Sequence, residues 1–325
     1  MIPDRRSDAM RLVGQRLVQL PLVLLIVSAL VFALLRSAPG NPGRNALGPY
    51  ATPEQVAAWN TAHDVGGGLF AEYAGWLGGF VTGDWGMSLV YGVPVRALVL
   101  ERFVNSVLLG LLAFAILVPV SIGIASVQAR VEGARVDRAL TVVIMAIAAV
   151  PEFVVGVLLL IALAVVLPVL PVRAADGFGE GVLPQFGAML LPAVTLALAW
   201  LAIVTRVARN GVIEASDSPF HRTAVVKGLR PGAVFRRHIA RSALIPTVAV
   251  LGIALGTLLG GSAVVETLFG YPGLGELLVT ATQRKDTAVL AAGVMVTGGT
   301  ALLAVLAADL VVAMLDPRVR LRGAR

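Results

Sequence analysis

Six long stretches without charge limit the fold of this chain more than any other feature of its sequence. A helix needs about 20 apolar residues to cross the hydrocarbon core of a bilayer, which is about 30 Å thick. Only Glu152 interrupts the third stretch, and Asp309 lies in the last turns of the sixth. We therefore predict an all-α membrane protein with six transmembrane helices. The stretches comprise residues 17–35, 103–129, 139–167, a segment within 181–205, 242–265 and about 287–315.

Composition argues against a soluble enzyme. Charged residues make up 14% of the 325 residues, whereas soluble domains carry roughly 25%. Such a sparse set of charges is sufficient only if much of the surface faces lipid. The chain has no cysteine, its three histidines fall in no metal-ligand spacing, and it contains no P-loop or hydrolase motif. We therefore expect no catalytic residue, no cofactor, no metal site and no enzymatic activity of its own.

The first apolar stretch could be a secretory signal peptide or a retained membrane anchor. The apolar core of a signal peptide has about 7–15 residues and precedes a cleavage site with small residues. Residues 17–35 form a longer run, and Leu35-Arg36-Ser37 is a poor cleavage site. We favour the retained transmembrane helix.

Lysine and arginine positions predict the orientation in the membrane. With a cytoplasmic N-terminus, the inner segments hold 19 of the 26 basic residues and the outer segments hold 7. Basic residues near span ends concentrate on the cytoplasmic side, so both termini are expected there. The same distribution explains the net charge of +7 without a nucleic-acid partner. The inner segments are 1–16, 128–138, 206–241 and 316–325.

The longest inner segment contains a short helix with its own start and stop signals. Ser218 suits the N-cap, and Gly228 suits the position just after the last turn. Phe220, Ala224 and Lys227 share one face of this helix. Isolated helices shorter than about 12–15 residues are marginal in water, so this one must pack on something. It is either an amphipathic helix on the bilayer surface or a docking helix for a cytoplasmic partner.

The same segment contains the run Arg222-Thr223-Ala224-Val225-Val226-Lys227-Gly228 and, after nine intervening residues, His238-Ile239-Ala240. Together these resemble the "EAA" loop of bacterial ABC-importer permeases, with Arg222 and Thr223 in place of the first Glu and Ala. The subtype resembles the B-type subunit of the dipeptide/oligopeptide/nickel group. Further matching stretches are Pro39-Gly40-Asn41-Pro42, Gly83-Asp84-Trp85-Gly86-Met87-Ser88, Ala243-Leu244-Ile245-Pro246, Val265-Glu266-Thr267-Leu268-Phe269-Gly270-Tyr271-Pro272-Gly273-Leu274-Gly275 and Leu315-Asp316-Pro317-Arg318.

The resemblance implies a type I permease of six helices that forms half of a translocation pore in the bacterial inner membrane. Its implied partners are a second, related permease, two cytoplasmic ABC ATPases and an extracytoplasmic substrate-binding protein. Di- or oligopeptides are the expected substrate, with nickel, glutathione or glycosides as alternatives. The residues implied to couple the chain to the ATPases are Phe220, Arg222, Thr223, Ala224, Val225, Lys227 and Gly228.

This resemblance also divides the chain into three parts. Residues 1–100 comprise the N-terminal tail, the first helix and an extracytoplasmic segment. Residues 101–315 form the permease domain with five helices and a coupling helix at about 218–228, and residues 316–325 form a cytoplasmic tail.

Polar and small residues inside the spans are candidates for the pore or for helix packing. An intramembrane acid usually faces a cavity or a partner. Glu152, where the family pattern has a small polar residue, is either a pore-lining charge or a protonated acid packed against a neighbouring subunit. Asp309, close to the inner end of its span, is better explained by a structural role. The small and polar candidates in the fifth span are Gly252, Gly256, Thr257 and Gly260.

The three glycines lie at four-residue spacing on one helix face. They permit either close packing within the bundle or a substrate path at the interface between two permeases. Pro119, Pro151 and Pro246 are expected to kink or end their helices.

Two other classes of membrane protein remain as alternatives. A scaffold or sensor without transport activity would share the docking helix, but it would need neither a polar path in the membrane nor a long outer segment. A proton-coupled carrier would be expected to show several paired charges within its spans. Here the spans contain two acids and no basic partner at depth.

Overall fold

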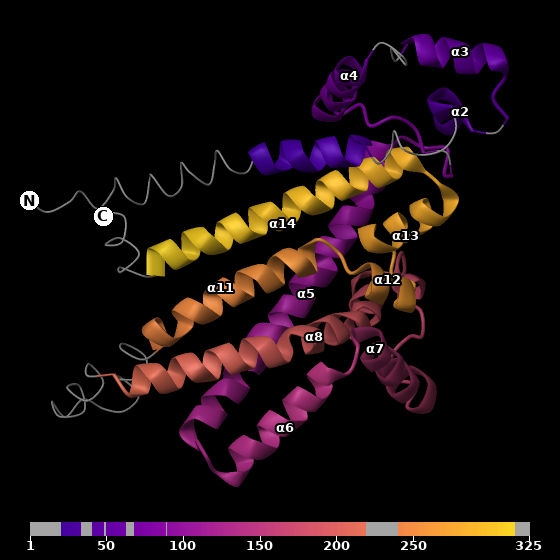
Figure 1. Ribbon diagram of the computed structural model, residues 1–325. Coiled ribbons are helices and arrows are strands. Elements are labelled where there is room, and N and C mark those ends of the chain that lie inside the picture. The colour runs from indigo at the N-terminus through magenta and orange to yellow at the C-terminus, as the bar shows by residue number, and fades with distance from the viewer. Residues whose placement is uncertain are drawn as a thin grey trace, which may run out of the picture.

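A computed structural model describes residues 21–33, 41–48, 50–62, 68–88, 90–218 and 240–315. The regular elements of these residues are helices (Figure 1). The smaller elements of the N-terminal third are α2 (Pro42–Leu47), α3 (Pro53–Ala62) and α4 (Leu69–Thr82). The remaining elements are α5 (Val95–Arg130), α6 (Arg135–Ala149), α7 (Glu152–Leu160), the π-helical turn η1 (Ile161–Val166), the 3-10 turn η2 (Ala174–Gly177), α8 (Val182–Ser216), α11 (Ala240–Leu259), α12 (Ala263–Phe269), α13 (Leu274–Arg284) and α14 (Thr287–Leu315).

Three helices of the described residues, α5, α8 and α14, are long and apolar enough to cross a membrane. Two bent pairs, α6 with α7–η1 and α11 with α12, raise this number to five if each pair is one span. The apolar helix Pro21–Ala33 is shorter, and the rest of the predicted first span lies outside the described residues. The count of six therefore stays a prediction.

The third predicted span is not a continuous helix. The chain bends by 100° between α6 and α7–η1. The bend arises because a proline disfavours the helical conformation of the residue before it, and Val150 is accordingly extended, with φ −90° and ψ 131°. Pro151 thus ends its helix as expected, whereas α5 and α11 continue past Pro119 and Pro246.

The fifth predicted span is also broken, with a bend of 50° between α11 and α12. Gly261 has φ +83°, a left-handed conformation that glycine adopts without the steric cost of a Cβ atom. Ser262 then caps α12, since its hydroxyl accepts a hydrogen bond from the Val265 N–H at 3.2 Å. The fifth predicted span, 242–265, is therefore not one continuous helix, because it is broken between Leu259 and Ala263.

The long helices α5, α8 and α11 pack around a shared apolar core. Small residues at the contacts allow close approach, as shown by the fully buried Ala113, Ala193 and Ala254. Helix α14 lies beside α11, and the helix Pro21–Ala33 lies along the outer side of α14 (Figure 1). The result is a layered bundle in which α8 occupies a central position.

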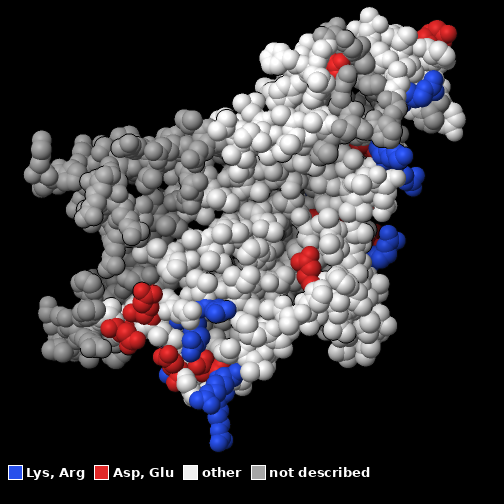
Figure 2. All heavy atoms as spheres, in the orientation of Figure 1, with Lys and Arg blue, Asp and Glu red and all other residues white. Residues whose placement is uncertain are grey.

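The ends of several helices lie at one end of this bundle. The C-terminal ends of α8 and α14 and the N-terminal end of α11 lie together at the left of Figure 1. Charged side chains gather near the α5–α6 turn and the end of α8, while most of the surface between there and the opposite edge is uncharged (Figure 2). Large apolar side chains are exposed on this surface, including Val142 and Leu158 at 66% and 59%. An exposed apolar surface of this kind suits contact with lipid or with another apolar surface.

Candidate functional site

The two broken spans meet at their breaks. Glu152 is the first residue of α7, and Ser262 is the N-cap of α12. The Ser262 hydroxyl donates a hydrogen bond to Glu152 Oε1 at 3.4 Å. Non-helical backbone within a membrane is tolerated only where it is buried in protein or lines a cavity, so two adjacent breaks mark this region as a candidate site.

A cavity of about 260 Å³ lies beside the α6–α7 bend. Of the described residues that line it, Glu152 is the charged one. Thr195 is the other polar side chain, and its hydroxyl donates to the Leu191 carbonyl of its own helix at 2.8 Å. The cavity therefore combines a single carboxylate with side chains that are mostly apolar. Its lining comprises Ile147, Ala148, Val150, Pro151, Glu152 and Val155 from the bend, and Thr195, Leu198 and Ala199 from α8.

A buried carboxylate supports the α12 side of the α11–α12 break. Glu266 is fully buried; its Oε1 accepts a hydrogen bond from the Ser106 hydroxyl at 2.7 Å, and its Oε2 accepts one from the Glu276 N–H at 3.1 Å. The Ser106 oxygen in turn accepts a hydrogen bond from the Leu274 N–H at 2.7 Å. These bonds connect α5, α12 and the first turn of α13.

The glycines of the motif around Glu266 have a common steric role. A Cβ atom at Gly273 or Gly275 would collide with the Glu266 carboxylate, and one at Gly261 would approach it to 3.0 Å. The carboxylate therefore fits only because three neighbouring positions lack side chains. This explains why a glycine-rich loop follows the glutamate in the sequence.

A second buried acid joins the segment before α5 to the last helix. Asp286 is fully buried and accepts hydrogen bonds from the Ser88 hydroxyl at 2.6 Å and the Val90 N–H at 3.2 Å. Its other oxygen accepts from the Val289 N–H at 3.3 Å and so caps the start of α14. The motif that ends at Ser88 thus anchors the segment before α5 to the α13–α14 turn.

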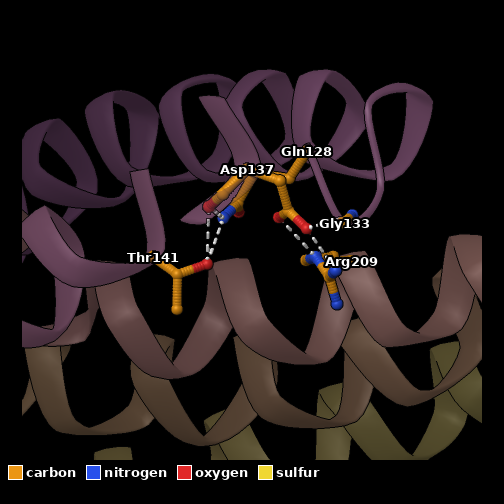
Figure 3. A network of polar contacts seen from close by, with 5 residues as sticks. All are labelled: Gln128, Gly133, Asp137, Thr141 and Arg209. Carbon is orange, nitrogen blue, oxygen red and sulfur yellow. Dashed lines mark hydrogen bonds and ion pairs between the residues drawn. The ribbon is translucent and has the colours of Figure 1, made fainter. Parts of the chain in front are cut away.

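At the opposite end, an ion pair clamps α6 to α8. Arg209 Nε and Nη2 donate to the two carboxylate oxygens of Asp137 at 3.0 and 2.8 Å, and the Gly133 N–H donates to the same carboxylate at 3.0 Å (Figure 3). The Gln128 amide donates to the Thr141 hydroxyl at 2.9 Å. The planar two-point geometry of this pair fixes the direction of both side chains, so α6, the α5–α6 turn and α8 form one connected unit.

The sequence-predicted glycines of α11 face α14. A Cβ atom at Gly252 would collide with the Ala308 methyl group, one at Gly256 would lie 3.3 Å from the Ala301 carbonyl oxygen, and one at Gly260 would lie 3.2 Å from Thr297. These positions therefore serve close helix packing within the chain.

The other predicted residues fall into different places. Thr257 is exposed and donates to the Ile253 carbonyl of its own helix at 3.1 Å. Asp309 lies in α14, and its side chain is outside the described part of the structure. The predicted coupling residues also lie outside the described residues: Phe220, Arg222, Thr223, Ala224, Val225, Lys227 and Gly228.

Sequence reasoning missed the polar connections that hold these elements. Glu266 and Ser88 belong to the motifs noted in the sequence, but their partners Ser106 and Asp286 lie 160 and 198 residues away along the chain. No short-range pattern joins such positions. For Asp137, the only sequence signal is an acid just ahead of an apolar stretch.

An apolar helical bundle with two broken spans that meet at their breaks, and a cavity beside one of them, has the architecture of a membrane transport protein. Comparison with known families agrees with this class. The family described as "Binding-protein-dependent transport system inner membrane component" matches residues 117–321, and its N-terminal counterpart matches residues 9–94. The chain belongs to this family of ABC transporter permeases, which confirms the resemblance read from the sequence.

Relatives along nearly the whole chain carry peptide-transport names. The probable peptide ABC transporter permease protein y4tP of Sinorhizobium fredii is 32% identical over 94% of this chain and 98% of its own length. The oligopeptide transport system permease protein AppB of Bacillus subtilis is 29% identical over 95% and 98%. The dipeptide transport system permease protein DppB of Lactococcus lactis is 30% identical over 94% and 98%. These relatives are membrane-embedded permease subunits rather than enzymes.

Proposed function

We propose that this chain is the permease subunit of an ATP-driven importer for di- or oligopeptides and forms half of the translocation path. The observation that carries this proposal is the similarity to peptide permeases over more than nine-tenths of the chain. The broken spans, and the cavity between the α6–α7 bend and α8, provide a place within the membrane where a polar substrate could be accommodated.

The proposed assembly pairs the chain with a second, related permease, two cytoplasmic ABC ATPases and an extracytoplasmic binding protein. In this proposal the chain spans the bacterial inner membrane six times and has both termini in the cytoplasm. The basic residues concentrated in the predicted inner segments support this orientation. The ends of α8, α11 and α14 that carry those segments lie at one end of the bundle (Figure 1).

The proposed coupling mechanism follows from the two helices that flank residues 219–239. Helix α8 ends at Ser216 and α11 begins at Ala240, so a movement of the segment between them acts on both helices. From Ser216, α8 runs to the cavity-lining Ala199, a distance of about 26 Å at 1.5 Å per residue. Helix α11 leads to the break before Ser262. Helix α8 therefore connects the predicted ATPase-binding segment to the cavity itself, and α11 connects it to the break whose Ser262 contacts Glu152.

The Asp137–Arg209 clamp gives this mechanism a second element. Because it joins the start of α6 to α8, a displacement of α8 moves α6 and the bend that carries Glu152 with it. We propose that closure of the ATPases drives this unit and changes access to the cavity.

The experiment that tests the proposal places a charge on the predicted docking face. Ala224→Asp would put an unpaired charge into the interface with the ATPase, which costs about 3–5 kcal/mol and therefore at least about a hundredfold in affinity. We expect normal abundance of the permease in the membrane, loss of the ATPase on co-purification and loss of peptide uptake. Ala233→Asp, the same substitution outside the predicted helix, is the matched control and should retain both properties.

Two results would contradict the proposal. If the Ala224→Asp protein still binds its ATPases and imports peptide at the wild-type rate, the docking assignment is wrong. If deletion of the whole chain leaves peptide uptake unchanged while the ATPases still bind it in wild-type cells, the chain is a scaffold. Uptake of nickel, glutathione or a glycoside in place of peptide would retain the permease assignment and change its substrate.

A further inference from the structure

One charge in the cavity has no role in the coupling scheme. We infer that Glu152, together with Ser262, forms a subsite for the positively charged α-amino group of the transported peptide. This inference rests on the proposed peptide-import function and names the part of the substrate that the cavity would recognise.

The position of Glu152 leaves its carboxylate accessible to a ligand. The side chain is half-buried at the lining of the cavity. Among the described residues, its hydrogen-bond partner is the Ser262 hydroxyl, at the long distance of 3.4 Å. By contrast, the fully buried Glu266 is bonded through both oxygens at 2.7 and 3.1 Å. Both carboxylate oxygens of Glu266 therefore already accept hydrogen bonds from the chain itself, whereas Glu152 retains most of its capacity to accept hydrogen bonds.

The charged side chains of the described residues leave the Glu152 carboxylate without a positively charged partner. The ion pairs among the described residues join Arg102 with Glu276 and Arg209 with Asp137, and neither includes Glu152. Glu152 also occupies the first turn of α7, where the helix dipole stabilises a negative charge. A negative charge within a membrane usually pairs with a positive one, and the protein supplies none within the described lining.

A peptide with a free N-terminus supplies this cation. Its α-amino group has a pKa of about 7.7–8.0 and is therefore mostly protonated near neutral pH. An ammonium group donates three hydrogen bonds, which Glu152 and the Ser262 oxygen can accept. A neutral or anionic ligand would leave the carboxylate unpaired.

The dimensions of the cavity suit the first residue of a peptide. At about 260 Å³, it is smaller than the roughly 300–1,000 Å³ of pockets that enclose whole drug-sized ligands. Apolar side chains of Ile147, Val155 and Leu198 form much of its wall, so an apolar first side chain can pack there. The rest of a longer peptide would extend beyond the cavity. The cavity is therefore a subsite for one end of the substrate.

The test compares two peptides that differ only at the N-terminus, which is a positively charged amino group in one and an uncharged N-acetyl group in the other. The assembled transporter, reconstituted in lipid nanodiscs without the binding protein, is loaded with a tritiated tripeptide and challenged with the free or the N-acetylated form. Omitting the binding protein removes its own preference from the measurement. We expect wild type to bind the free peptide about tenfold more tightly than the N-acetylated peptide. A factor of about ten is the contribution expected from one partly desolvated ion pair.

The variants separate charge from structure. Glu152→Gln keeps the shape and removes the charge, so the preference for the free amino group should disappear while binding of the acetylated peptide stays unchanged. Glu152→Asp should restore much of the preference. Glu180→Gln, the same change on an exposed outer residue, is the matched control and should behave as wild type.

Three outcomes would overturn the inference. A wild-type preference retained in Glu152→Gln would place the recognition elsewhere. If Glu152→Gln and Glu152→Asp both bind the two peptides more weakly by the same factor, the role of Glu152 is packing, either within the chain or against a neighbouring subunit. Equal binding of both peptides by wild type, with uptake intact in cells, would reject the subsite and leave peptide import standing. Absence of any peptide binding or uptake by wild type would instead reject the proposed function.

Discussion

Removal of a single hydroxyl group tests whether the Glu266 cluster, formed by Glu266, Ser106 and the backbone of Leu274 and Glu276, holds α5, α12 and α13 together. Ser106 is 1% exposed and connects three elements, because its hydroxyl donates to Glu266 and accepts from the Leu274 N–H, both at 2.7 Å. Ser106→Ala deletes this atom and leaves the volume nearly unchanged. The change therefore measures the hydrogen bonds rather than a cavity.

The expected cost follows from the two groups that lose their partner. Interhelical hydrogen bonds in membrane proteins contribute about 0.6 kcal/mol on average and up to about 1.7 kcal/mol, and the bond to a buried carboxylate belongs near the upper limit. The Leu274 N–H would be left buried without an acceptor, which costs about 1–3 kcal/mol. We therefore expect Ser106→Ala to reduce the free energy of unfolding by about 2–4 kcal/mol.

The same helix provides a matched control. Ser121 is also fully buried, but its hydroxyl donates to the Val118 carbonyl of its own helix at 3.2 Å. Ser121→Ala removes no contact between elements and should cost less than about 1 kcal/mol. Unfolding of the purified variants in mixed micelles, titrated with a denaturing detergent and followed by tryptophan fluorescence, gives both values. If Ser106→Ala costs no more than Ser121→Ala, the Glu266 cluster does not stabilise the fold as argued.

Two further predictions concern orientation and helix packing. Because the chain has no cysteine, Ala57→Cys should react with an impermeant thiol reagent in intact cells and Ala233→Cys only after lysis; labelling of Ala233→Cys in intact cells would refute the predicted orientation. Gly252→Ala should lower the free energy of unfolding by about 1–3 kcal/mol, because the added methyl group collides with Ala308. Gly123→Ala meets open space and should be neutral or stabilising by up to about 1 kcal/mol; equal effects of the two changes in the same titration would contradict the packing described for α11 and α14.

Much of the helical architecture could be predicted from short-range patterns. The sixth predicted span, about 287–315, coincides with α14, and the second lies within α5. The fourth predicted span is shorter than the helix that contains it, since α8 continues beyond Thr205 to Ser216. This difference arises because hydropathy marks only the apolar part of a helix, whereas the last turns of α8 carry charged residues and remain helical through packing and the Asp137–Arg209 clamp.

The breaks in the third and fifth spans show where hydropathy fails. Apolar residues lie on both sides of Pro151 and of Gly261, so a sliding average registers one span in each case. Proline and glycine signal that a break is possible, yet α5 and α11 continue past Pro119 and Pro246. Whether the chain turns at such a residue depends on whether neighbouring elements satisfy the freed backbone groups.

The sequence by itself determined the membrane class, the helical fold, the family and the segments at the predicted inner end, because apolar length, charge position and local motifs are encoded in neighbouring residues. Only the tertiary structure decided that the two breaks meet and that Glu152 lies beside Ser262, 110 residues further along the chain. It also decided that the glycine face of α11 packs on α14 and that Glu266 is enclosed by glycines. These contacts depend on the rotation and crossing of helices within the bundle, which many weak packing interactions set together and no local pattern records.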